Sequence, residues 1–141
     1  MKVIILIIVI TTVSFFSSCE DDSSTNSSMT TYKYISYSSD SRIIISGYFW
    51  IDSVDSTTVK GRWNFMRIGN EENLGPQIGK GNFEGITRLG GMSFNLNPEM
   101  IDNNVILDGS TLRPRRFEGT WSYIGFPGII NRGTFEAEQI R

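Results

Sequence analysis

Few side chains in this sequence are of a type and spacing that could carry out acid–base or nucleophilic chemistry. The chain has no histidine and one cysteine, which excludes Ser-His-Asp and Cys-His catalysis and the common zinc site types. Two carboxylate pairs remain: Glu71 with Glu72 in an expected loop, and Glu136 with Glu138 on a strand face expected to be solvated. Paired carboxylates act as acid and base only where their surroundings separate their pKa values, and nothing near these pairs indicates that. We therefore expect a protein that is not an enzyme and has no catalytic residues, metal ligands or cofactor.

Arg113-Pro114-Arg115-Arg116 forms a dense basic cluster. Arginine makes bidentate contacts with planar anionic groups, so the cluster could bind an anionic headgroup or a polysaccharide. The alternative is a solubilising turn without a ligand. The chain as a whole has 13 Lys and Arg against 15 Asp and Glu. This mildly acidic balance argues against a nucleic-acid partner, whose phosphates require a basic surface.

The fold class is indicated by segments in which glycine stands two places before an aromatic residue. A chain of 141 residues has room for one domain, and 14 glycines with 12% aromatic residues favour all-β structure. The pattern occurs at Gly47-Tyr48-Phe49, Gly61-Arg62-Trp63, Gly81-Asn82-Phe83, Gly119-Thr120-Trp121 and Gly133-Thr134-Phe135. Glycine on the inward face of a barrel permits tight coiling, and a neighbouring aromatic ring can fill the space beside it.

The alternation predicts about eight strands joined mostly by short turns. They cover residues 32–37, 42–54, 59–68, 78–89, 92–97, 105–112, 117–123 and 131–137, with a short helical turn at 98–102. An antiparallel up-and-down β-barrel is the most economical arrangement, because closure leaves no sheet edge unpaired. A two-sheet β-sandwich is the alternative. No run is long enough for a crossover helix, so a parallel sheet is excluded.

Within segment 42–54 the alternation assigns side chains to two faces. The inward positions are Ile43, Ile45, Gly47, Phe49 and Ile51. Ile44, Tyr48 and Trp50 then point outward, where large apolar groups need cover. Either segment 32–37 covers them, or they form a docking patch for a partner or a sugar.

The inward-facing aromatic side chains are the candidate ligand-binding residues. They are Phe49, Trp63, Phe65, Phe83, Phe94, Trp121, Tyr123 and Phe135. These rings either fill the interior, as side chains often do in eight-stranded barrels, or line a pocket for a small apolar ligand. In strand count and alternation the chain resembles the lipocalins, and that resemblance implies a barrel with an interior binding site. The chain departs from the family in lacking a Gly-x-Trp opening near the mature N-terminus.

The N-terminal residues have the pattern of a secretory signal. Lys2 supplies a positive start, and residues 3–16 form a mostly apolar run that is too short for a comfortable bilayer span. The ending Phe16-Ser17-Ser18-Cys19 resembles the lipobox of bacterial lipoproteins, with phenylalanine in place of the usual leucine. The resemblance implies a signal peptide over residues 1–18, with Cys19 acylated by fatty acids such as palmitate. The alternative is an ordinary signal peptide followed by an incidental free cysteine.

Residues 19–31 are expected to form an acylated flexible tether that precedes a β-barrel domain over residues 32–141. The Ser, Thr and Asn content of the tether cannot bury a core. Acyl chains on Cys19 contribute about 0.8 kcal/mol per buried CH₂ to membrane attachment. The acidic Glu20-Asp21-Asp22 resembles the export signal of surface-displayed lipoproteins in some diderm bacteria. We therefore expect attachment to a bacterial outer membrane through the lipid anchor, with display on the cell surface.

These features predict an envelope lipoprotein that binds a small hydrophobic molecule without catalysis. The alternative function is an accessory subunit of a surface complex with a filled barrel. An open barrel mouth and a cavity of about 300 Å³ or more between the aromatic side chains would favour the first. A filled barrel with exposed Tyr48 and Trp50 would favour the second.

Overall fold

The computed structural model describes residues 29–141 and contains eight β-strands in this part of the chain. In order they are β1 (Thr30–Tyr37), β2 (Ile43–Val54), β3 (Thr58–Arg67), β4 (Gly79–Arg88), β5 (Gly91–Asn95), β6 (Asn103–Ser110), β7 (Arg116–Gly125) and β8 (Gly128–Gln139). Each overlaps one predicted strand, and β1 includes Thr30 and Thr31 from the predicted tether. The predicted signal peptide, the acylation site at Cys19 and the tether up to residue 28 lie outside the described residues.

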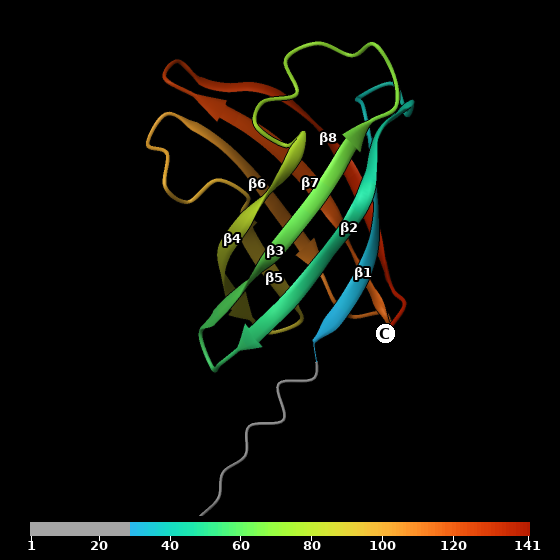
Figure 1. Ribbon diagram of the computed structural model, residues 1–141, viewed down its shortest axis with the longest axis vertical. Helices are drawn as coiled ribbons and strands as arrows, with labels where there is room; N and C mark the ends of the chain where they lie inside the picture. The colour runs from blue at the N-terminus through green and yellow to red at the C-terminus, as the bar shows by residue number, and fades with distance from the viewer. Residues whose placement is uncertain (1–28) are drawn as a thin grey trace, which may run out of the picture.

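The strands form one closed barrel (Figure 1). Each strand pairs antiparallel with its neighbours in sequence, and β8 returns to pair with β1, where Ala137 lies opposite Tyr34. Closure leaves neither β1 nor β8 with a free edge, which removes a route to edge-to-edge aggregation. The all-β class and the eight-stranded up-and-down barrel are thus confirmed, and the alternative of a β-sandwich is wrong.

The two ends of the barrel carry different connections (Figure 1). Because the strands alternate in direction, the connections after β1, β3, β5 and β7 share one end, which we call the distal end. The connections after β2, β4 and β6 share the other end with the start of β1 and the last residues of β8; we call this the terminal end. The long connection from residue 68 to 78 arches over the distal end.

Strand β3 shows how the sequence alternation becomes an inside and an outside. Val59, Trp63 and Phe65 are buried, whereas Lys60 and Arg62 between them are exposed. Successive side chains point to opposite faces of a strand, so one face of every strand lines the barrel core. The largest fully buried side chains are Trp121, Tyr34, Phe49, Phe65, Phe83, Phe94, Phe117, Phe135, Ile44, Ile45, Leu74 and Leu96.

The start of β2 departs from the predicted alternation. The pairing of β1 with β2 slips between Ser36 and Tyr37, so that Ser36 lies opposite Ile45 and Tyr37 opposite Ile43. This irregularity places an extra residue, Ile44, in β2, and Ile44 joins the buried core while Ile43 is exposed. The predicted faces of Ile43 and Ile44 are therefore wrong, because one inserted residue reverses the alternation beyond it.

The predicted helical turn after β5 is also wrong, because residues 29–141 contain no helix there or elsewhere. Pro98 and Glu99 instead occupy a turn in which the amide of Met100 donates to the carbonyl of Asn97 at 3.1 Å. The Asn97 side-chain amide donates to the carbonyl of Asn103 at 3.0 Å. This contact across the loop binds Asn97 to the start of β6, so its side chain does not cap a helix.

Candidate functional site

The predicted ligand-binding residues come together in the barrel interior. Seven of the eight are buried there, and Tyr123 is partly buried and packs against the same core. The buried seven are Phe49, Trp63, Phe65, Phe83, Phe94, Trp121 and Phe135. The structure thus places all eight side chains on the inward face, where the alternation predicted them.

Phe49 lies at the centre of these aromatic contacts. Its ring stacks on Tyr32 with a centroid distance of 4.8 Å. It meets Phe83, Phe94 and Phe117 edge-on at 6.0, 5.8 and 6.3 Å. Offset-stacked and edge-to-face pairs at these separations are favourable geometries for aromatic rings. The rings therefore fill the space that they enclose by contact with one another.

Two buried tryptophans donate hydrogen bonds from their indole N–H groups to main-chain carbonyls at or near the ends of other strands. Trp63 Nε1 donates to the carbonyl of Leu96 at 2.9 Å, and Trp121 Nε1 donates to the carbonyl of Tyr37 at 2.9 Å. A Cβ atom added at Gly133 would lie 2.6 Å from Trp121 Nε1, and one added at Gly81 would lie 3.0 Å from the Trp63 ring. These glycines leave the room that the indoles occupy, as the sequence pattern predicted.

The connection between β3 and β4 contributes two buried residues near the distal end. Leu74 belongs to the core cluster, and the Gln77 side chain is fully buried, where its Nε2 donates to the Leu74 carbonyl at 2.7 Å. Gly75 has a left-handed φ of 67°, and a Cβ there would lie 2.5 Å from the Tyr123 ring. Glycine is thus required both by conformation and by the close approach of the ring.

Three buried polar atoms lack a hydrogen-bond partner among the described residues: Tyr34 Oη, Ser36 Oγ and Gln77 Oε1. Burial raises the pKa of the Tyr34 hydroxyl, because the phenolate would be desolvated, and the neighbouring Ser36 hydroxyl offsets this by a smaller amount. An unsatisfied buried polar group costs about 1–3 kcal/mol, and each one therefore needs an explanation. A water molecule or a polar group of a ligand beside these atoms would remove that cost.

The outer wall of β2, β3 and β4 is hollowed around Trp50. The hollow has a volume of about 520 Å³. It is lined by Met29, Trp50, Arg62, Trp63, Asn64, Lys80, Gly81 and Asn82. The strand register explains this grouping, because Trp50, Arg62 and Asn82 lie side by side on three neighbouring strands, and Asn64 lies beside Lys80. Arg62 is held in place by a bidentate pair with Asp52 at 2.9 and 2.8 Å.

The hollow continues past β4 because the barrel wall is incomplete beside this strand. β4 pairs with β5 only over Glu84–Arg88, so Gly79–Phe83 has a strand partner on the β3 side alone within residues 29–141. A second hollow of about 380 Å³ lies there and shares Lys80 and Asn82 with the first. We call the two hollows together the wall groove. Trp63 Nε1, at 3.3 Å from the Asn82 carbonyl and 2.9 Å from that of Leu96, bridges the gap from inside.

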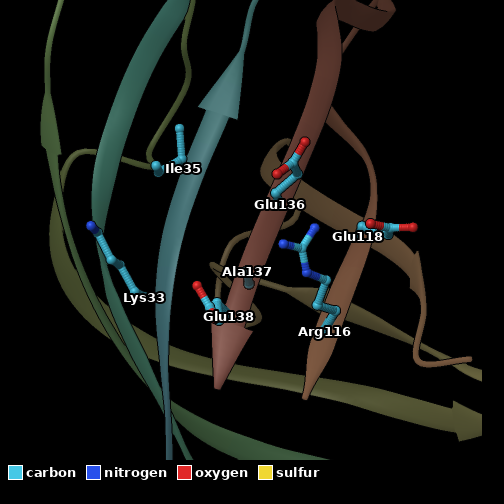
Figure 2. A pocket seen from close by; sticks show the side chains of 7 residues that line it. All are labelled: Lys33, Ile35, Arg116, Glu118, Glu136, Ala137 and Glu138. Atoms are coloured by element: carbon cyan, nitrogen blue, oxygen red, sulfur yellow. The ribbon is translucent and has the colours of Figure 1, made fainter. Parts of the chain in front are cut away.

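The acidic pair Glu136 and Glu138 lies on the outer face of β8, between β7 and β1 (Figure 2). These exposed carboxylates border a small pocket of about 100 Å³ that also involves Lys33 and Arg116. Lys33, Glu138 and Arg116 are neighbours across β1, β8 and β7, so positive and negative side chains alternate around the wall. The arrangement is that of solvated surface charges, in agreement with the sequence prediction.

The described residues show no metal site and no membrane-spanning helix. No group of three or more His, Cys, Asp or Glu side chains in residues 29–141 could hold a metal ion. No helix in this range is long and apolar enough to cross a membrane. Comparison with protein-family models, curated proteins and solved structures found no match.

Sequence reasoning missed three parts of this arrangement. Tyr34 was predicted in a strand but not as an interior residue, although its alternation with Tyr32 and Ser36 was a signal that could have identified it. Leu74 and Gln77 lie in a loop without periodicity, so no local signal predicts their burial. The wall groove depends on the register of three strands and on where β5 ends, and neither is encoded in a local pattern.

Proposed function

We propose that the protein is a lipid-anchored lipoprotein of the bacterial outer membrane that acts by binding and not by catalysis. The support for the anchor is the apolar N-terminal run that ends in Phe16-Ser17-Ser18-Cys19. Cys19 is the single cysteine of the chain and the residue that would carry the acyl chains. The acidic residues 20–22 support display on the cell surface.

We further propose that the protein is an accessory subunit of a surface complex and that its partner docks in the wall groove. The main support is the incomplete barrel wall at Gly79–Phe83. This part of β4 has no partner on the β5 side within residues 29–141, and its side chains Lys80 and Asn82 are exposed. An extended peptide can add to such an edge through main-chain hydrogen bonds, while neighbouring hollows accept its side chains. Trp50 offers a large, rigid aromatic contact of the type that dominates binding energy at interfaces.

The filled interior favours this function over the binding of a small apolar ligand. The rings around Phe49 contact one another directly, so a ligand between them would have to displace core side chains. Core packing is dense, and forcing extra atoms into it costs about 1–3 kcal/mol or more. Tyr48 is 43% exposed, as expected of an interaction subunit, whereas Trp50 is half-buried in the wall groove.

A small hydrophobic ligand with a polar group is the second candidate function. It is favoured by the unsatisfied atoms Tyr34 Oη, Ser36 Oγ and Gln77 Oε1. Such a ligand would enter by displacement of residues 68–78 and satisfy these atoms with its polar group. Native mass spectrometry of the full-length protein from its own membranes tests this candidate, because a co-purifying apolar small molecule would support it and a clean protein mass would count against it.

A comparison of Trp50→Ala with Tyr48→Ala tests the wall groove. Both residues are outward-facing aromatics on β2, but Tyr48 does not line the hollow. The two variants and the wild type carry a photo-reactive residue in place of Asn82, and the cross-linked partner is identified and quantified in the intact envelope. We expect Trp50→Ala to reduce the cross-linked partner roughly tenfold or more, as for an interface aromatic anchor. Equal yields from Trp50→Ala and Tyr48→Ala would refute docking in the groove.

A further inference from the structure

Two exposed leucines lie in adjacent connections at the terminal end of the barrel. Leu89 is 106% exposed in the turn after β4, and Leu112 is 80% exposed in the connection after β6. The amide of Thr111 donates to the carbonyl of Gly90 at 2.9 Å, and a Cβ at Gly90 would lie 2.9 Å from Leu112 Cδ2. The two connections therefore form one apolar tip, which consists of residues 89–90 and 111–112.

The arginine cluster borders this apolar tip. Arg113 is 3.4 Å from a carboxylate oxygen of Glu118, and Arg115 donates to the main-chain carbonyl of Gln139 at 3.0 Å. Arg115 and Arg116 are exposed and form no salt bridge within residues 29–141, although Arg116 lies opposite Glu138 on β8 and shares a pocket with Glu118 and Glu136. Two exposed leucines and a basic cluster thus lie at the same end of the molecule. The combination of exposed apolar side chains with adjacent cations is typical of surfaces that bind anionic membranes.

The N-terminal segment joins the barrel at this same end. The amide of Gln139 donates to the carbonyl of Arg115 at 2.8 Å, and that of Ile140 donates to the carbonyl of Thr31 at 2.9 Å. These bonds connect the arginine cluster to the first described residues of β1, which follow directly on residues 1–28. A lipid anchor at Cys19 would therefore be attached to the barrel beside the leucines and the arginines, with residues 20–28 between.

We propose that the terminal end docks on an anionic lipid surface, with Leu89 and Leu112 inserted among the headgroups and Arg113, Arg115 and Arg116 bound to phosphate groups. This inference rests on the lipid anchor proposed above, because the anchor confines the terminal end near the bilayer and raises its effective concentration there. With the terminal end on the membrane, the wall groove on the side of the barrel faces along the membrane surface. The distal end then points away from the membrane.

The distal end serves as the internal control, because it is also apolar. Ile101 and Phe126 are 91% and 89% exposed there, in the connections after β5 and β7. Exposure alone therefore does not distinguish the two ends; the attachment point and the arginine cluster do. If exposed apolar side chains were sufficient for insertion, a probe at Ile101 would enter the bilayer as readily as one at Leu89.

The test uses the full-length acylated protein in vesicles of phosphatidylglycerol and phosphatidylethanolamine. Cys19 is the only cysteine and its thiol would be blocked by acylation, so Leu89→Cys and Ile101→Cys each introduce a unique site for an environment-sensitive fluorophore. We expect a blue-shifted emission and quenching by lipid-borne quenchers for the probe at position 89, and neither for the probe at position 101. Equal quenching at both positions, or quenching at position 101 alone, would overturn the proposal.

A second experiment separates failure of the tip from failure of the anchor. The mass of the purified protein reports acylation directly, so an unmodified Cys19 would refute the anchor alone. Binding of Cys19→Ala protein to vesicles then tests the tip without the anchor. We expect affinity roughly tenfold higher for anionic than for zwitterionic vesicles, and loss of binding when Leu89→Ser and Leu112→Ser are combined. Circular dichroism checks that both proteins are folded, and equal binding to the two vesicle types would refute the tip.

Discussion

The indole Nε1 of Trp121 donates a 2.9 Å hydrogen bond to the main-chain carbonyl of Tyr37. This bond joins β7 to the end of β1 across β8, which lies between them in the barrel. Gly133 of β8 makes the contact feasible, because it is paired with Trp121 and has no side chain to block the indole. Barrel closure therefore includes a side-chain contact in addition to the ladder of main-chain hydrogen bonds.

Removal of Trp121 should destabilise the barrel strongly. The side chain is fully buried, so Trp121→Ala is expected to lower the free energy of unfolding by about 3–5 kcal/mol. Trp121→Phe keeps most of the apolar contact but loses the bond to Tyr37, and its expected cost is about 1–3 kcal/mol. Denaturant unfolding measures both changes. A free energy of unfolding for Trp121→Ala close to that of the wild type would contradict the burial of this face.

A methyl group at Gly133 should also be destabilising. A Cβ there would lie 2.0 Å from the Tyr37 carbonyl oxygen, which is main chain and cannot swing aside. We expect Gly133→Ala to cost about 1–3 kcal/mol, as is usual for overpacking. Gly69→Ala is the matched control, because the nearest atom to a Cβ at that position is 3.7 Å away. Similar thermal unfolding of the two variants would show that the close approach at Gly133 relaxes without cost.

The buried hydroxyl of Tyr34 should make the protein less stable at high pH. Burial raises its pKa above the ordinary value of 10.0, so the unfolded state releases this proton first as the pH rises. The stabilising difference is complete below about pH 10 and is lost above it, with a slope of about 1.4 kcal/mol per pH unit. Urea unfolding between pH 8 and 12 should show a shallower decline for Tyr34→Phe than for the wild type.

At neutral pH the same substitution tests whether a ligand or a water molecule is bound beside the Tyr34 hydroxyl. Tyr34→Phe removes a buried hydroxyl whose one polar neighbour is Ser36, in a geometry that does not make a regular hydrogen bond, so we expect unchanged or increased stability, by about 1–3 kcal/mol. A loss of stability would show that the hydroxyl is satisfied, and Ser36→Ala in the same assay separates a bond to Ser36 from one to water or a ligand. Phe65→Leu serves as a control for the loss of ring contacts, because Phe65 stacks on Tyr34 at 4.3 Å.

Replacement of Cys19 should release the protein from membranes. If this thiol carries the acyl chains, Cys19→Ala abolishes the anchor, and the protein should move from the membrane fraction to the soluble fraction on cell disruption. Immunoblotting of the two fractions measures the change, and Ser18→Ala provides a neighbouring control that keeps the cysteine. Retention of Cys19→Ala in the membrane fraction after a high-salt wash would contradict the lipoprotein proposal.

The alternation along β3 shows how much of the fold was predictable. Trp63 and Phe65 were assigned inward and Arg62 outward from the sequence, and the structure agrees. The period of two is a property of the extended backbone itself, so a segment of ten residues carries enough signal. At β2 the same reasoning failed for Ile43 and Ile44, because the irregularity opposite Ser36 and Tyr37 is set by pairing with another strand.

The sequence by itself determined the all-β class and the inward aromatic faces, because these follow from residue types and local periodicity. Only the tertiary structure decided between barrel and sandwich, since closure depends on pairing of β1 with β8 at opposite ends of the domain. It also decided that the rings fill the interior and that a groove opens beside Lys80. Both results depend on distances between residues on different strands, which local sequence patterns do not specify.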